Sequence, residues 1–321
     1  MAEAYYNAAS GNWSTAANWK GGTLGDGNLP QSGDDVYANG KAVVIDQDIT
    51  VNSLRTTAGG VAVAGGSFTV SSTGRTLTVN STIISGSSTC VLVTTTGTLT
   101  INGSSLTING SAASTNVNTV NNNTTGTVNV TANVVGGGVT SAIGLRNSTS
   151  GTIHLTGNTT GGSGQAQGCY NGTGGTFTVS GNATGGGTSS AYGIQNASSG
   201  TITVGGTTTG GTNSTAYGAY NSANGTILLN GAVTASSSAP AVSSAATSSG
   251  FVRITGPITN SSGVNACTSS RVCLVAECDW TIAKAGTPPS YDGTVTIGLK
   301  SGGSGGGGGR ILRSSIIGAI L

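Results

Sequence analysis

This chain has very few charged or aromatic side chains. Charged residues make up 6% of its 321 residues and aromatic residues 4%, and it contains one His and one Met. Large side chains are what fill a thick hydrophobic core, so this composition argues against an ordinary compact globule. We expect a thin core instead.

Carboxylates are missing from the middle of the chain. All nine lie before residue 49 or after residue 276: Glu3, Asp26, Asp34, Asp35, Asp46, Asp48, Glu277, Asp279 and Asp292. Calcium sites need clustered carboxylates, and glycoside hydrolases generally need two that face each other. His154 has no Asp near it in sequence, which favours a surface residue over a general base. We therefore predict no catalytic residue, no metal site, no cofactor and no enzymatic activity.

Membrane, export and nucleic-acid signals are also lacking. No window approaches the roughly 18 apolar residues of a membrane span, and the first residues lack a basic stretch followed by an apolar one. The net charge is +2 with scattered Lys and Arg, unlike the surface of a nucleic-acid binder. The five Cys have no paired spacing, which argues against a disulfide framework. We expect synthesis in a cytoplasm and no nucleic-acid partner.

Glycine, in contrast, is abundant and recurs at fixed spacing. One series lies 24 or 25 residues apart: Gly126, Gly151, Gly175, Gly200, Gly225 and Gly250. Apolar and polar residues alternate after each Gly, as in a β-strand. Two inward columns are predicted, one of Val128, Ile153, Phe177, Ile202, Ile227 and Val252, the other of Val130, Leu155, Val179, Val204, Leu229 and Ile254.

Such a repeat cannot bury its own apolar face and is stable only when stacked. The sequence therefore predicts an all-β fold, a single-chain parallel β-solenoid (β-helix) with about 25 residues per coil and caps at both ends, since open edges would recruit other chains. Runs of Gly at 136–138, 161–162, 185–187 and 210–211 are predicted to form corners. No strand-to-helix fingerprint follows them, so they do not indicate a phosphate-binding loop.

An Asn ends a second short element in mid-repeat. Its four copies are Asn147, Asn171, Asn196 and Asn221. Asn tolerates the left-handed backbone of a corner, and its amide can bond to the next amide along a stack. We predict a structural Asn ladder; the alternative is a set of solvated turn residues.

The chain divides into four segments: an N-terminal cap at 1–48, the solenoid at 49–276, a C-terminal cap at 277–300, and a Gly-rich tether with an apolar tail at 301–321. The tail carries Ile311, Leu312, Ile316, Ile317, Ile320 and Leu321. It is too short to span a bilayer, and exposed it would promote aggregation. We expect it to dock into another subunit; the alternative is that it folds back over the last coil.

The N-terminal residues resemble a known family. Asn12-Trp13, Asn18-Trp19, Pro30-x-x-Gly33-Asp34-Asp35-Val36 and the strands at 43–46 and 49–52 look like the opening segment of bacterial and bacteriophage β-helical proteins of the pectin-lyase-like superfamily. The resemblance covers about residues 10–260. Members include autotransporter passenger domains, phage tail fibres, spikes and other virion surface proteins. These motifs mark architecture rather than activity.

The resemblance implies a non-enzymatic structural component of a phage virion, a tail fibre, spike or capsid-surface protein. Other virion proteins, in the tail or the capsid, would hold it through residues 310–321, and it would lie on the virion surface. Tyr192, Tyr217 and Tyr220 are candidates for contact with host surface glycans. One alternative is a secreted adhesin of the autotransporter kind, which would need an export signal and a membrane barrel. The other is a polysaccharide-degrading tailspike whose carboxylates meet between chains of a homo-oligomer.

Overall fold

A computed structural model describes residues 1–70, 74–84, 91–93, 97–110, 118–138, 142–164, 166–187, 190–213, 215–235, 239–245, 251–256, 258–259, 272–274, 278–282 and 295–299. These residues are mainly strands and turns, with one short 3₁₀ helix, η1, at Ala16–Asn18. No helix among them has the length and apolar character needed to cross a membrane.

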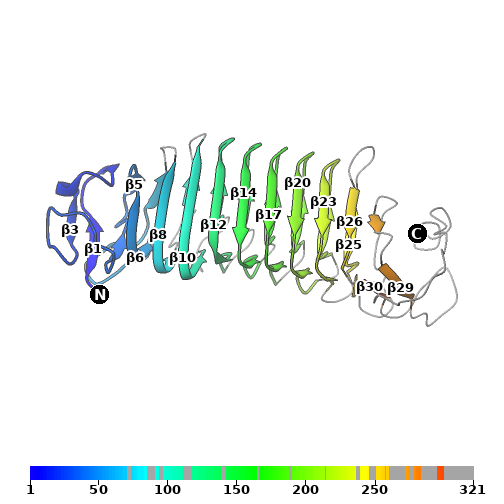
Figure 1. Cartoon of the computed structure of the whole chain (residues 1–321). Helices are drawn as coiled ribbons and strands as arrows, with labels where there is room; N and C mark the ends of the chain where they lie inside the picture. The colour runs from blue at the N-terminus through cyan, green and yellow to red at the C-terminus, as the bar shows by residue number, and fades with distance from the viewer. Residues whose placement is uncertain are drawn as a thin grey trace, which may run out of the picture.

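The strands stand side by side along a rod, and the chain advances along it coil by coil (Figure 1). Two sheets form its long faces. Among the described residues, sheet A has 18 strands: β1 Glu3–Tyr6, β3 Trp19–Gly21, β4 Asp35–Tyr37, β6 Ile49–Arg55, β8 Arg75–Ile84, β10 Thr98–Asn109, β12 Thr127–Val135, β14 Thr152–Thr156, β15 Thr159–Thr160, β17 Thr176–Val179, β18 Ala183–Thr184, β20 Thr201–Val204, β21 Thr208–Thr209, β23 Thr226–Leu229, β24 Val233–Thr234, β26 Phe251–Ile254, β27 Ile258–Thr259 and β28 Val272–Leu274.

Sheet B runs along another side of the rod. In the described part of the chain it has 10 strands: β2 Ser10–Asn12, β5 Ala42–Ile45, β7 Ser67–Val70, β9 Val91–Val93, β11 Val120–Asn122, β13 Leu145–Asn147, β16 Cys169–Asn171, β19 Ile194–Asn196, β22 Ala219–Asn221 and β25 Val242–Ser244. Most of these strands are only three residues long, because the chain must turn again before it returns to sheet A.

Successive coils pair in parallel and in register. Ile153 lies opposite Phe177, Phe177 opposite Ile202, and Ile202 opposite Ile227. The pairing of β1 with β3 is antiparallel, whereas β12, β14, β17, β20, β23 and β26 form one continuous parallel series. This arrangement confirms the predicted β-solenoid with coils of about 25 residues.

The core consists of facing columns of small and medium-sized apolar side chains. Both inward columns predicted for sheet A are buried, with every member at most 2% exposed. Sheet B supplies a facing column of Val120, Leu145, Cys169, Ile194, Ala219 and Val242. Burying one Val, Leu, Ile or Phe contributes about 1.5–3 kcal/mol, so the repetition of this thin layer, rather than its depth, stabilises the rod.

The N-terminal end contains the largest buried side chains. Trp13 and Trp19 lie with their ring centroids 4.6 Å apart, and Tyr6 meets Trp19 edge-on at 5.1 Å. The Trp19 Nε1 donates to the carbonyl oxygen of Trp13 at 2.9 Å. Strands of residues 1–48 join the same two sheets, so the predicted N-terminal cap is continuous with the stack.

At the other end, β29 Cys278–Ile282 and β30 Val295–Leu299 pair antiparallel as a separate sheet. Their side chains, and the whole of residues 300–321, lie outside the described residues. The predicted docking tail, from Ile311 to Leu321, falls in that part of the chain.

Candidate functional site

The predicted Asn residues end successive strands of sheet B and point into the rod. Asn147, Asn171, Asn196 and Asn221 are all fully buried. Each Nδ2 donates to the carbonyl oxygen of the Gly four residues later, at 2.6–2.8 Å. The principal bond of each side chain thus closes the corner of its own coil.

Contacts of this column between coils are longer. Asn171 Nδ2 lies 3.3 Å from Asn196 Oδ1, and Asn196 Nδ2 lies 3.3 Å from the carbonyl oxygen of Thr226. Asn122 is a fifth member, buried and bonded to Gly126 at 3.0 Å. Asn122 was not predicted, because residues 117–121 lack the Ala-x-Gly motif that precedes the later Asn residues.

The Asn column also explains the regularly spaced glycines. A Cβ atom added to Gly175 would overlap Asn147 Nδ2 of the preceding coil, and Gly200 stands in the same relation to Asn171. The corner therefore has room for a glycine and for no larger residue. The repeated Gly and Asn residues therefore pack against each other between neighbouring coils.

A second Asn column, on the outside of the rod, was not predicted. The backbone N–H of Asn158 donates to Asn133 Oδ1 at 3.2 Å, and that of Asn182 donates to Asn158 Oδ1 at 2.8 Å. Thr207 N continues the series to Asn182 Oδ1 at 2.8 Å. These side chains connect neighbouring coils directly. Their regular spacing of 24–25 residues is the feature of the sequence from which the column could have been predicted.

Of the N-terminal carboxylates, Asp34 is fully buried. Its side chain accepts hydrogen bonds from Thr23 N at 3.0 Å, Thr23 Oγ1 at 2.5 Å and Gln31 N at 2.8 Å. Buried carboxylates are tolerated when they are bonded in this way. Asp34 therefore fixes the loops on either side of it and has no free oxygen aimed at solvent.

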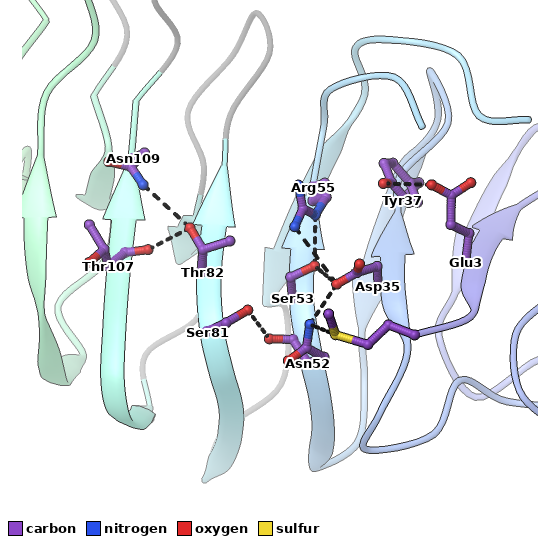
Figure 2. Close-up of polar contacts among 11 residues, drawn as sticks. Glu3, Asp35, Tyr37, Asn52, Ser53, Arg55, Ser81, Thr82, Thr107 and Asn109 are labelled. Atoms are coloured by element: carbon purple, nitrogen blue, oxygen red, sulfur yellow. Dashed lines mark hydrogen bonds and ion pairs between the residues drawn. The ribbon is translucent and has the colours of Figure 1, made fainter. Parts of the chain in front are cut away.

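Asp35 and Glu3 are the centres of two separate sets of polar contacts on sheet A (Figure 2). Asp35 Oδ1 accepts from Ser53 Oγ at 2.5 Å and Asn52 Nδ2 at 2.7 Å, and Arg55 Nη2 lies 3.8 Å away. These contacts tie β4 to β6, so the carboxylate is engaged in joining adjacent strands.

Glu3 makes the equivalent connection at β1. Its carboxylate accepts from the Tyr37 hydroxyl at 3.1 Å and from Gly60 N at 2.7 Å. Burial, followed by the bond to Glu3, raises the pKa of Tyr37. Glu3 and Asp35 are partners in the register of β1 and β4, and each is held by its own set of donors.

Two other residues of chemically reactive types, His154 and Cys169, lie at separate places on the rod. His154 is exposed on the outer face of sheet A, in register between Asn129 and Thr178. Cys169 is fully buried in the sheet B column, and this burial raises the pKa of its thiol. Within the described ranges, no three His, Cys, Asp or Glu side chains come together as a metal site.

The three predicted surface tyrosines form one cluster beside sheet B: Tyr220 lies on β22, and Tyr192 and Tyr217 lie two residues before β19 and β22. Tyr192 and Tyr217 are stacked with centroids 5.4 Å apart and planes 5° from parallel. Tyr220 packs against both at 4.9 Å and 5.4 Å. Burial raises the pKa of Tyr192. Tyr192 and Tyr217 each cover one face of the other ring.

Tyr220 of this cluster also belongs to a row of outward side chains that was not predicted. We call it the sheet B strip; it consists of the outward residues at the centre of five consecutive strands, Asn121, Arg146, Tyr170, Gln195 and Tyr220. Arg146 Cζ lies 5.4 Å from the centroid of the Tyr170 ring. Gln167 Nε2 donates to Gln195 Oε1 at 3.2 Å. In the sequence, most of these residues occupy the variable position directly before each repeated Asn, and this position could have identified the row.

Searches with protein-family models, among curated proteins and among solved structures found no match to this chain.

Proposed function

We propose that this chain is a non-enzymatic structural component of a bacteriophage virion, a fibre, spike or capsid-surface protein. The main support is the amino-acid composition and the strand pairing of the rod. Residues 49–276 contain no Asp or Glu, while buried columns and parallel pairing run through this region. Such a rod offers an extended, rigid surface for contact rather than a reactive centre. The resemblance of the N-terminal residues to bacterial and bacteriophage β-helical proteins supports the assignment to a virion.

Immunogold labelling of intact phage particles tests the virion assignment. We expect labelled particles, with label on the tail favouring host attachment and label on the capsid favouring decoration. Particles assembled without this chain serve as the control. Unlabelled wild-type particles from a lysate that contains the chain would contradict the proposal.

The non-enzymatic part has its own test. Purified chain incubated with host surface polysaccharide should leave the viscosity of the solution unchanged. A fall in viscosity would favour a tailspike enzyme whose carboxylates come together between subunits.

Attachment is proposed to occur through residues 310–321. Deleting this tail should abolish incorporation into particles and leave the thermal unfolding of the rod unchanged, because the tail would contact another protein. Normal incorporation together with earlier melting of the rod would show instead that the tail covers the last coil.

A further inference from the structure

We propose that the sheet B strip binds saccharides that carry carboxylate groups. The inference rests on the proposed function, because it names the chemistry of the surface that a virion protein of this kind would contact. It concerns the half of the strip around Arg146 and Tyr170, together with the amide and hydroxyl groups beside it.

The charge of Arg146 favours an acidic ligand. In the described part of the chain this guanidinium has no carboxylate partner, and its Nε is buried without a hydrogen bond. The coils on either side of Arg146 cannot supply a partner either, since residues 49–276 hold no Asp or Glu. A ligand carboxylate would supply the opposite charge that the guanidinium lacks.

Tyr170 holds the guanidinium of Arg146 in one orientation. Tyr170 is the register partner of Arg146 on the next strand, and its ring lies beneath the Arg146 Cζ at 5.4 Å. A cation over an aromatic face is attracted by the ring and is held in place there. A planar guanidinium held on one face still presents its edge, which is the geometry that bonds a carboxylate through two parallel N–H groups.

Polar side chains lie on either side of Arg146 and Tyr170. Gln195 is already held by Gln167 at 3.2 Å and by Ser222 Oγ at 3.3 Å, so these amides lose little freedom when a ligand binds. Asn121 lies on the other side of Arg146 in the register. Amide and tyrosine hydroxyl groups both donate and accept, which suits the hydroxyl groups of a sugar.

The length of the strip matches a chain molecule rather than a single ion. From Arg146 to Tyr220 there are three steps between paired strands, or about 15 Å at about 4.8 Å per step. A nucleic acid is disfavoured because its phosphates require a groove lined with several cations, and this strip contains one. An acidic oligosaccharide needs one cation among many neutral hydrogen-bonding groups.

The test is calorimetric titration of the full chain with short oligosaccharides built from glucuronate, mannuronate or sialate, each compared with its methyl ester. The ester keeps the sugar hydroxyls and removes the negative charge. We expect at least one acid to bind, and its ester to bind about tenfold or more weakly. Arg146→Gln should weaken binding of the acid by a similar factor and leave the ester unaffected.

Arg253→Gln is the matched control, because it removes the same charge from an exposed position on the outer face of sheet A. It should change binding little, and Arg146→Lys, which keeps the charge and loses the planar edge, should bind at an intermediate level. Circular dichroism would verify that each variant remains folded. These titrations use purified protein. Their result therefore tests saccharide binding separately from the virion assignment that immunogold labelling tests.

Four outcomes would overturn the inference: no binding by any of the acids, equal binding of acid and ester, equal weakening by Arg253→Gln and Arg146→Gln, or binding of single-stranded DNA as tight as that of the acids.

Discussion

At the scale of single residues, the buried Asn side chains hold the corners of the rod. Asn196 donates to Gly200 at 2.7 Å, and the second contact reaches Thr226 in the next coil. Asn196→Ala would remove this bond, so the Gly200 carbonyl oxygen would keep only the one from Thr226 N at 2.9 Å, and a cavity would open in the buried column. We expect the free energy of unfolding to fall by about 1–3 kcal/mol, measured by urea denaturation. Asn230→Ala, at an exposed position, should have little effect, and equal effects would contradict this role.

The glycines of the repeat differ in the space around them, and two adjacent ones allow a direct comparison. A methyl group on Gly175 would overlap the Asn147 amide, whereas one on Gly174 would meet Ser199 Oγ at an ordinary distance of 3.5 Å. Gly175→Ala should therefore destabilise the rod by about 1–3 kcal/mol. Gly174→Ala should be nearly neutral in the same denaturation experiment. Equal losses from the two substitutions would mean that the Asn column does not set the glycine spacing.

Tyr192 links the tyrosine cluster to the pH dependence of stability. Burial raises its pKa above the ordinary value of 10.0. The unfolded chain then loses its proton first as pH rises, so stability is full below that value and declines above it. Tyr192→Phe should make the decline above about pH 10 shallower, as seen in urea unfolding at a series of pH values. An unchanged slope would show that Tyr192 titrates normally.

At the scale of the coil, each repeat is a unit that pairs with its neighbours. Deleting residues 201–225 joins Gly200 to Thr226 at equivalent points of the repeat, so Thr176 can pair directly with Thr226. This variant should keep a β-sheet circular dichroism spectrum and cooperative unfolding. Deleting 201–212 removes half a coil and puts later residues out of register, and this chain should lose cooperative unfolding. Similar behaviour of the two deletions would contradict the stacked repeat.

Elements with a regular periodicity could be predicted from the sequence. Strict alternation around Ile153 and Phe177 identified the inward columns correctly, because a strand buries every second side chain. The direction of the Asn bonds was not accessible in the same way. Whether Asn171 bonds first to Gly175 or to Asn196 depends on the backbone geometry of the corner, which residue spacing does not specify.

The candidate site was harder to recognise than the fold. Its residues are four different types at one register position, so Arg146, Tyr170 and Gln195 show no repeated letter. Their common position, directly before each repeated Asn, was the only sign of the row in the sequence, and the pairing of strands shows that they lie side by side. The tyrosines were noticed individually, but the stacking of Tyr192 on Tyr217 arises from a register that has to be seen in three dimensions.

At the scale of the whole molecule, charge is separated along the chain. Residues 1–48 carry six carboxylates against two Lys, a formal charge of −4, whereas residues 49–276 carry five Arg and no carboxylate, a formal charge of +5. The acidic end is occupied by strand-joining networks such as that of Asp35 (Figure 2). The cationic rod leaves Arg146 available, which is why the proposed ligand is an acid.

Interspin distances along one outward column would measure the stacking of the coils directly. Thr98, Thr127, Thr152, Thr176, Thr201 and Thr226 occupy successive positions in register. In a chain with its native Cys replaced by Ala, spin labels at 127 and 226 should lie about 19 Å apart, and labels at 98 and 226 about 24 Å apart, apart from the spread contributed by the labels. A regular increase of one strand spacing per repeat is the predicted result. Distances that fail to increase with the number of repeats between the labels would contradict the stacked solenoid.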